Sequence, residues 1–268
     1  MRLDVCGRSA YAYSGGKAFD ASAPCVIFVH GALHDHSVWT LLARWCANHG
    51  YAVLAPDLPA HGRSEGPALT SAGAIADWLL ALIDTAGVAE AALVGHSMGS
   101  LVALEAAAKA PARATALVLA GMAYPMAVSA ALLESAQTTP LAAIDAVNVF
   151  SHSSFAAKPS YPGPGNSLHG ANRTLMRRVQ AGCSDANLFL VDFQVCDSYR
   201  GGAEAAARVR CPVTLVLGEH DQMTRPSQAG EIAAALRAKT VRVAAGHSMM
   251  AEAPDALLAA LKEALPRG

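Results

Sequence analysis

Four short apolar runs, each ending in glycine or in a turn, constrain the fold of this chain more than any other feature. They cover residues 25–29, 51–55, 91–94 and 115–119 and are rich in β-branched side chains. Their hydrophobicity is continuous rather than alternating, which is typical of strands covered on both faces in a parallel sheet. A fifth run over 213–217 and a short sixth run over 240–243 extend the pattern.

Segments with helical spacing and many alanines and leucines separate these runs. They cover residues 37–48, 71–86, 98–110, 227–238 and 254–265. Strand alternating with helix predicts right-handed crossovers in one doubly wound, mostly parallel sheet, so the fold class is α/β. The first two dozen residues, with Gly15 and Gly16 as a turn, are expected to add an antiparallel hairpin at the sheet edge.

The alternation of strand and helix breaks between Met122 and Arg210. Helical pieces near 128–148 and 171–199 flank a turn-rich segment over 158–166, and no strand pattern occurs there. A long insertion inside a compact domain usually carries function, so we predict an inserted helical cap. The expected division is a core over 1–124, a cap over 125–200 and the rest of the core over 201–268.

Residues 95–99 read Gly-His-Ser-Met-Gly and lie between a predicted strand and a predicted helix. In that setting G-x-S-x-G is typical of a nucleophile elbow, whose tight turn needs the flanking glycines and whose serine projects above the sheet. The alternative is an ordinary glycine-rich turn without chemistry. We predict that Ser97 is a nucleophile.

A serine hydroxyl is a weak nucleophile at neutral pH and needs a base, which in turn needs an orienting acid. Among ten histidines, His247 follows the last short strand, where a loop at the carboxyl edge of the sheet reaches the serine. Asp221 follows the 213–217 run and precedes that histidine, which is the expected chain order for the acid. Glu219, Asp192 and Asp197 are the alternatives.

Acyl transfer also requires donors for a developing oxyanion, and backbone N–H groups serve that purpose. We predict the N–H groups of Met98, directly after the serine, and of Ala32, in the loop after the first run, with Leu33 as the alternative.

Apolar residues of the cap are expected either to enclose an apolar pocket or to form the core of the cap itself. These candidates are Met122, Tyr124, Met126, Phe150, Phe155, Tyr161, Leu168, Met176 and Phe189. The residues that we predict to bind substrate are Leu33, Tyr124, Met126, Met223 and Met249.

Taken together, the motifs occur in the order seen in the α/β-hydrolase superfamily. They are His30-Gly31 with Trp39 downstream, Asp57-Leu58-Pro59-Ala60-His61-Gly62-Arg63-Ser64, the elbow, the Asp221 loop and Gly246-His247. The whole chain resembles the capped esterase, lactonase and C–C hydrolase branch, although Pro59-Ala60 stand where many relatives have Arg-Gly. The resemblance implies an eight-stranded sheet, a helical cap between strands six and seven, and hydrolysis of a small ester or lactone through an acyl-enzyme.

Two other functions stay open. A hydrolase of carbon–carbon bonds in acidic, diketone-like substrates would use the same triad and would need Arg173, Arg177 or Arg178 in the pocket. A ligand-binding receptor on the same scaffold would need no turnover. Dehalogenase and epoxide-hydrolase chemistry is disfavoured because both require a carboxylate where this chain has Ser97.

Charge and composition narrow the partners. The formal charge is -1, from 20 basic and 21 acidic residues, and no basic run suggests a nucleic-acid partner. No apolar stretch is long enough for a membrane span and no signal core follows Met1, so we expect a cytoplasmic protein, either monomer or homodimer. The six cysteines are scattered and are expected to be reduced. We expect no cofactor and no metal, because His34-Asp35-His36 lacks a ligand cluster around it.

Overall fold

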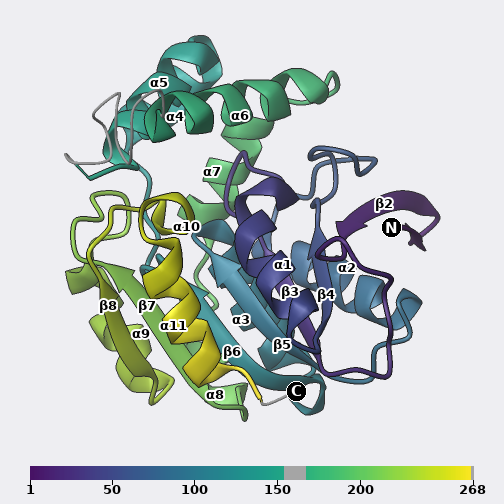
Figure 1. Cartoon of the computed structure of the whole chain (residues 1–268). Coiled ribbons are helices and arrows are strands. Elements are labelled where there is room, and N and C mark those ends of the chain that lie inside the picture. Colours follow the sequence, from purple (N-terminus) through teal and green to yellow (C-terminus); the bar gives the residue numbers. More distant parts are fainter. Residues whose placement is uncertain (154–166, 267–268) are drawn as a thin grey trace.

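The computed structural model describes residues 1–153 and 167–266 of the chain. Within them, one eight-stranded sheet has the order β1-β2-β4-β3-β5-β6-β7-β8 (Figure 1). Strands β3 to β8 are parallel, which confirms the predicted α/β fold with a mostly parallel sheet. The strands are β1 (Arg2–Val5), β2 (Arg8–Tyr13), β3 (Cys25–Val29), β4 (Ala52–Pro56), β5 (Ala91–His96), β6 (Ala114–Ala120), β7 (Val213–Gly218) and β8 (Lys239–Val243).

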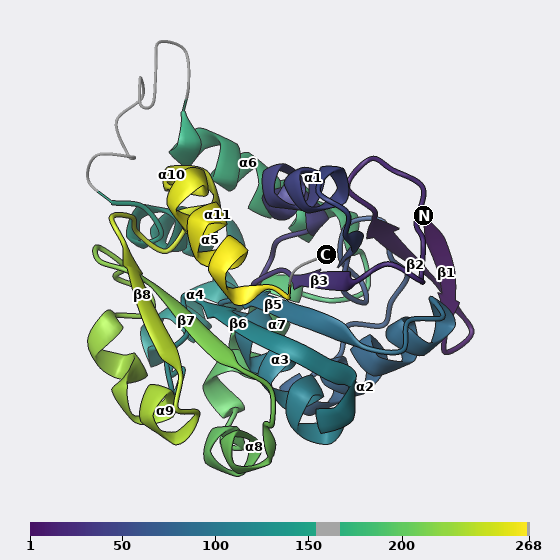
Figure 2. The same cartoon turned by 60° about the horizontal axis from the view of Figure 1, so that its bottom comes forward.

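Helices cover both faces of the sheet (Figure 2). On one face lie α1 (Thr40–Asn48) and α11 (Pro254–Ala264), and on the other lie α2 (Ala72–Thr85), α3 (Met98–Lys109), α8 (Gly202–Arg208) and α9 (Gly230–Ala235). Because successive side chains of a strand point to opposite faces, β3 supplies Val26 and Phe28 to one core and Ile27 to the other. The continuous apolar runs therefore fill two cores at once.

The cap lies between β6 and β7, above the carboxyl ends of the parallel strands (Figure 1). Its described helices are α4 (Ala130–Thr138), α5 (Pro140–Phe150), α6 (Leu168–Gly182) and α7 (Leu188–Ser198). The predicted piece over 128–148 is two helices, because Pro140 begins a new helix. The predicted piece over 171–199 is also two helices, because α6 ends at Gly182 and Asn187 begins α7 by accepting a hydrogen bond from the Leu190 N–H.

The inserted helical cap is thus present, whereas the predicted boundaries at 124/125 and 200/201 stay predictions. The turn-rich segment over 158–166 lies outside the described residues. Short connections complete the fold: the 3-10 turns η1 (His36–Trp39), η2 (Pro111–Arg113) and η3 (Pro226–Ala229), and the one-turn helix α10 (Met249–Glu252). None of the described helices combines the length and apolarity that a membrane crossing requires.

The N-terminal hairpin forms at the sheet edge, but its turn is not the expected one. The chain reverses at Cys6 and Gly7, which have φ angles of 55° and 76°. Positive φ at two successive positions gives a turn that matches the twist of the flanking strands. Gly15 instead lies against α1, where an added Cβ would come within 2.4 Å of the Ala47 Cβ and 2.6 Å of the Ala43 carbonyl oxygen.

Replacement of Gly15 by alanine should therefore destabilise the fold more than the same change at Gly16. Both residues have positive φ, so the backbone strain of the two variants is similar, but a Cβ at Gly16 meets only the Tyr13 hydroxyl at 3.5 Å. We expect Gly15→Ala to lose about 1–3 kcal/mol more free energy of unfolding than Gly16→Ala, because helix α1 must shift. Equal losses in urea unfolding would contradict this packing.

Candidate active site

Ser97 occupies a strained turn between β5 and α3. Its φ of 53° and ψ of -122° lie outside the regions that non-glycine residues usually adopt. The Ser97 N–H donates to the Ala120 carbonyl at 2.9 Å, and the Ser97 carbonyl accepts the Ser100 N–H at 2.8 Å. Such strain persists only where the surroundings enforce it, and it concentrates at functional sites.

Close backbone packing explains the two glycines of the motif. A Cβ on Gly95 would lie 2.1 Å from the Gly99 carbonyl oxygen, and a Cβ on Gly99 would lie 2.4 Å from the Val29 carbonyl oxygen. The first turn of α3 therefore presses against β5 and β3 more closely than any side chain allows. This packing fixes Ser97 at the carboxyl edge of the sheet.

Asp221 and His247 meet at the same edge, after β7 and β8 respectively. The His247 Nδ1 lies 2.8 Å from the Asp221 Oδ2. The Thr224 hydroxyl donates to that oxygen at 2.8 Å, and the N–H groups of Met223 and Thr224 donate to the Asp221 Oδ1, each at 2.8 Å. A carboxylate in this setting accepts from every neighbour, so the proton of the neutral imidazole tautomer lies on Nδ1 and its lone pair on Nε2.

Asp221 is only 3% exposed. Burial alone would raise its pKa, but the charge and hydrogen bond of His247 and the hydrogen bonds from Thr224 lower the pKa overall. Asp221 is therefore ionised at neutral pH and orients the ring of His247.

Ser97 and His247 line one cavity of about 470 Å³ beneath the cap. In the described residues the Ser97 hydroxyl makes no hydrogen bond to the imidazole, and in unliganded sites of this kind that bond is often long. The three residues that the sequence singles out thus lie at one edge of the sheet, with Asp221 and His247 in contact and Ser97 on the same cavity wall. A hydroxyl, an imidazole with a free Nε2 and an ionised carboxylate can together perform nucleophilic catalysis.

The alternative acids lie elsewhere. Glu219 is exposed at the end of β7. Asp192 accepts the Leu33 N–H at 2.7 Å, and Asp197 accepts the Val128 N–H at 2.9 Å. Among the described contacts, none of these three carboxylates touches His247.

Both predicted oxyanion donors, Met98 and Ala32, lie where their backbone N–H groups are near the serine. The Met98 N–H is the first amide of α3, one of those at a helix start that lack an acceptor within the helix. Ala32 lines the cavity. The alternative, Leu33, is not available, because its N–H already donates to Asp192.

Only some of the residues that we predict to bind substrate line the cavity. Met126 and Met223 line the cavity, whereas Leu33, Tyr124 and Met249 do not. Leu33 and Met249 are fully buried in the two cores. Tyr124 packs beside Tyr199 instead, and its hydroxyl donates to the Arg200 carbonyl. A sequence pattern does not tell which face of a loop such side chains take.

The apolar residues predicted for the cap also occupy different places in the structure. Phe150 and Met176 line the cavity, Leu168 lines a neighbouring one, and Met122 and Phe189 are fully buried. Phe155 and Tyr161 lie outside the described residues. Further cavity residues lie on the cap helices and were not predicted, because helical spacing was their only signal: Leu132, Val147, Phe193 and Cys196.

His96 lies beside the imidazole of His247 rather than pointing away from the site. Its Nε2–H donates to the His247 carbonyl at 2.9 Å, and the ring centroids are 4.7 Å apart. Burial lowers the pKa of His96 well below its usual value and also lowers that of His34, which lines the cavity. Both rings are therefore neutral and place no positive charge at the site.

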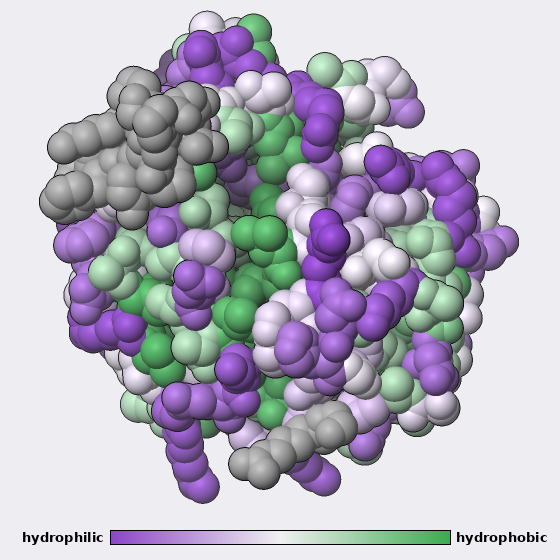
Figure 3. Space-filling model, in the orientation of Figure 1, coloured by the Kyte–Doolittle hydropathy of each residue, from purple (hydrophilic) through white to green (hydrophobic). Residues whose placement is uncertain are grey.

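A second cavity of about 660 Å³ lies between α1, α6 and α10, and His34 lines both cavities. Its apolar wall includes Val38, Leu41 and Met250. On the face of the molecule seen in Figure 3, hydrophobic residues gather at the centre, below the cap.

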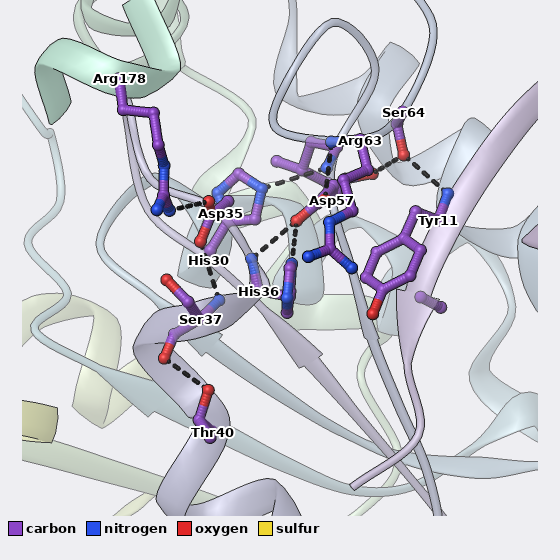
Figure 4. Close-up of polar contacts among 12 residues, drawn as sticks. Tyr11, His30, Asp35, His36, Ser37, Thr40, Asp57, Arg63, Ser64 and Arg178 are labelled. Carbon is purple, nitrogen blue, oxygen red and sulfur yellow. Dashed lines mark hydrogen bonds and ion pairs between the residues drawn. The ribbon is translucent and has the colours of Figure 1, made fainter. Parts of the chain in front are cut away.

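Asp35, His36 and Asp57 form the described cluster whose ligand atoms could surround a metal ion, all within 4.8 Å of one another (Figure 4). Asp57 Oδ1 already accepts from the backbone N–H of His36 at 2.8 Å and from its Nδ1–H at 2.7 Å. Asp35 accepts from Ser37 and from the Arg178 guanidinium. The carboxylate oxygens of Asp35 and Asp57 thus already accept hydrogen bonds from protein groups, and the expected absence of a metal stays a prediction.

Comparison with known proteins places these features in a family. Residues 26–260 match the model of the alpha/beta hydrolase family. The chain is 38% identical over 119 residues to the dihydrolipoyllysine-residue acetyltransferase component of an acetoin cleaving system from Cupriavidus necator, and 37% identical over 104 residues to the lipase LipV of Mycobacterium tuberculosis. These alignments cover 43% and 38% of this chain but only 30% and 39% of the two relatives.

Among solved structures, the chain is similar to an enol-lactonase from Burkholderia xenovorans, with a TM-score of 0.84 and 21% sequence identity over 98% of both chains. At this level of identity the likeness concerns the fold.

If Asp221 orients the imidazole, Asp221→Asn should slow the reaction of Ser97 with a fluorophosphonate probe by on the order of 10³-fold, because an amide favours the wrong tautomer. Glu219→Gln, two residues away and exposed, is the matched control and should react at the wild-type rate. Mass spectrometry of the labelled peptide over time measures both rates. A larger effect at Glu219 than at Asp221 would reverse the assignment of the acid.

Proposed function

This chain belongs to the alpha/beta hydrolase family, and we propose that it cleaves a small carboxylic ester or lactone through an acyl-enzyme intermediate on Ser97. One observation supports the proposal most strongly. The His247 Nδ1 lies 2.8 Å from the ionised Asp221, and His247 lines the same cavity as the strained Ser97. The names of a lipase relative and of an enol-lactonase neighbour agree with ester and lactone chemistry.

In the proposed first step, the His247 Nε2 takes the proton of the Ser97 hydroxyl while the oxygen attacks the substrate carbonyl carbon. The carbonyl oxygen becomes an oxyanion that the N–H groups of Met98 and Ala32 stabilise. His247 then returns the proton to the leaving alkoxide as the carbon–oxygen bond breaks. Water, activated by the same ring, attacks the acyl-enzyme and releases the carboxylic acid and the free serine.

The cavity favours a substrate whose buried part is uncharged. Among the described residues that line it, none is an arginine, lysine, aspartate or glutamate, and the lining is mostly apolar, with Phe150 and Phe193 as its phenylalanines. Burial of an unpaired charge in such a site is costly. A neutral, apolar acyl or alkyl group of modest size is therefore the expected occupant.

Carbon–carbon bond hydrolysis of acidic substrates finds less support. Arg173 and Arg177 both pair with Asp145 on the outer side of the cap, and Arg178 pairs with Asp35. None of these three arginines lines the cavity that contains Ser97. The charge that would recognise an acidic diketone is thus engaged elsewhere.

Ser97→Ala should lower kcat on p-nitrophenyl butyrate by about 10⁴-fold or more while leaving the fold unchanged, because no other nucleophile of the site is expected to replace it. Ser184→Ala, at an exposed serine outside the cavity, is the control and should retain full activity. Wild-type activity in Ser97→Ala, or a wild-type protein that a fluorophosphonate leaves unlabelled, would favour a binding role.

A neutral acyl group should also be preferred over a charged one of similar length. We expect kcat/KM for p-nitrophenyl butyrate to exceed that for p-nitrophenyl hydrogen succinate by at least about tenfold, because the second substrate must bury a carboxylate. Equal or reversed values would indicate a cationic group in the pocket and would support the acidic-substrate alternative.

A further inference from the structure

A buried carboxylate of the cap contacts the loop that carries the proposed oxyanion donor. Asp192 lies on α7 and is 2% exposed. Its Oδ2 accepts the Leu33 N–H at 2.7 Å and lies 2.9 Å from the Nε2 of His61. One oxygen atom therefore joins three segments that are far apart in the sequence.

The partners of His61 define its protonation. Its Nδ1 lies 3.0 Å from the Pro59 carbonyl oxygen, and its Nε2 faces the Asp192 carboxylate, which already accepts from Leu33. Both neighbours accept hydrogen bonds only, so both ring nitrogens carry a proton and the ring is an imidazolium. Burial would lower the pKa of His61, but the charge and hydrogen bond of Asp192 raise the pKa overall.

The turn that carries His61 is itself held in place (Figure 4). The Arg63 N–H donates to the Asp57 carboxylate at 2.9 Å, and the Ser64 hydroxyl donates to the Asp57 carbonyl at 2.7 Å. The Tyr11 N–H donates in turn to the Ser64 hydroxyl at 2.9 Å. These bonds hold the backbone around His61 in one conformation.

Hydrogen bonds on both sides of Ala32 then fix the direction of its N–H. The Gly31 carbonyl accepts from the His30 Nδ1–H at 2.9 Å and from the His34 N–H at 3.3 Å. In a trans peptide the carbonyl and the N–H point in opposite directions, so these bonds aim the Ala32 N–H away from them. On the other side, Asp192 holds the next peptide N–H, that of Leu33, whose φ of 54° is unfavourable for leucine.

We propose that Asp192, paired with protonated His61, is a positioning residue that holds the loop of Ala32 in the conformation that stabilises the oxyanion. The inference rests on the proposed function of Ser97 and adds to it a role for the cap beyond enclosing the pocket. Helix α7 also contributes Phe193 and Cys196 to the cavity wall, so the same helix both lines the cavity and contacts the loop of Ala32 through Asp192.

The test compares Asp192→Ala with Asp192→Asn, which keeps an oxygen for the Leu33 N–H but loses the charge. We expect kcat on p-nitrophenyl butyrate to fall by about 10- to 100-fold in Asp192→Ala, and less in Asp192→Asn, with KM changed less than about threefold. Tyr199→Phe is the matched control, because it removes another buried hydrogen bond of this region, from the Tyr199 hydroxyl to Glu105, away from the oxyanion loop. It should lose stability but retain kcat.

If kcat of Asp192→Ala and of Asp192→Asn stays at the level of Tyr199→Phe, or if only KM rises, the inference is wrong. Should the alanine variant fail to fold, the asparagine variant alone decides between these outcomes. Labelling of wild-type Ser97 by the fluorophosphonate is scored separately. An unlabelled serine in an inactive wild-type protein overturns the proposed function, whereas a labelled and active wild type with an indifferent Asp192 overturns only this inference.

A pH profile gives a readout that a purely structural role would not change. The charged and titratable groups that face His61 are Asp192, Asp57 and His30, whose ring centroid lies 4.9 Å away. Burial lowers the pKa of His30 to about 4, and the pKa of Asp57 is lowered as well, so neither group titrates above neutral pH. The thiol of Cys196, which faces Asp192, has a raised pKa because it is buried.

Because the pKa of His61 is raised, the ion pair of His61 and Asp192 is present below that pKa and loses its positive charge as the pH rises through it. We expect kcat of the wild type to fall on the alkaline side, and we expect His61→Gln, which can donate to Asp192 but does not titrate, to lack this fall. The same alkaline fall in both proteins would contradict the role of His61.

Discussion

The close contact of three backbones around Ser97 is the constraint on which the rest of the site depends. Gly95 and Gly99 allow the first turn of α3 to lie against β5 and β3 at distances that exclude any Cβ. This packing forces Ser97 into its unusual backbone conformation and presents the adjacent Met98 N–H at the start of a helix. The parallel sheet then determines which other residues arrive at the same edge, since β6, β7 and β8 follow β5 in that order across the sheet.

Two buried aspartate–histidine pairs lie in this region, and they differ in what faces the second ring nitrogen. In the pair of Asp221 and His247, only Nδ1 meets the carboxylate, so Nε2 keeps a lone pair that can accept a proton. In the pair of Asp192 and His61, both nitrogens meet acceptors, so the ring is held as a cation. The same two residue types thus suit proton transfer in one place and fixed positioning in the other, because the local acceptors differ.

Much of this arrangement could be predicted from the sequence, because its strongest signals are local. Continuous apolar runs predicted the parallel strands, and the glycines around Ser97 predicted a turn whose backbone contacts were then observed. Side-chain direction was less accessible, because it depends on contacts between distant segments. Met249 lies in a core rather than in the cavity wall, and Asp192 reaches Leu33 across 159 positions of sequence. The periodicity of hydrophobic residues along the sequence does not indicate a contact between such distant segments.

The most direct test of a Ser97-centred site is a crystal structure of the protein after reaction with a fluorophosphonate, whose tetrahedral phosphorus resembles the first intermediate. We predict a covalent bond from phosphorus to the Ser97 Oγ, and a phosphoryl oxygen within about 2.7–3.1 Å of the backbone nitrogens of both Met98 and Ala32. Phosphorus bound to a different side chain, or a phosphoryl oxygen turned away from both amides, would contradict the assignment of the nucleophile and its oxyanion donors.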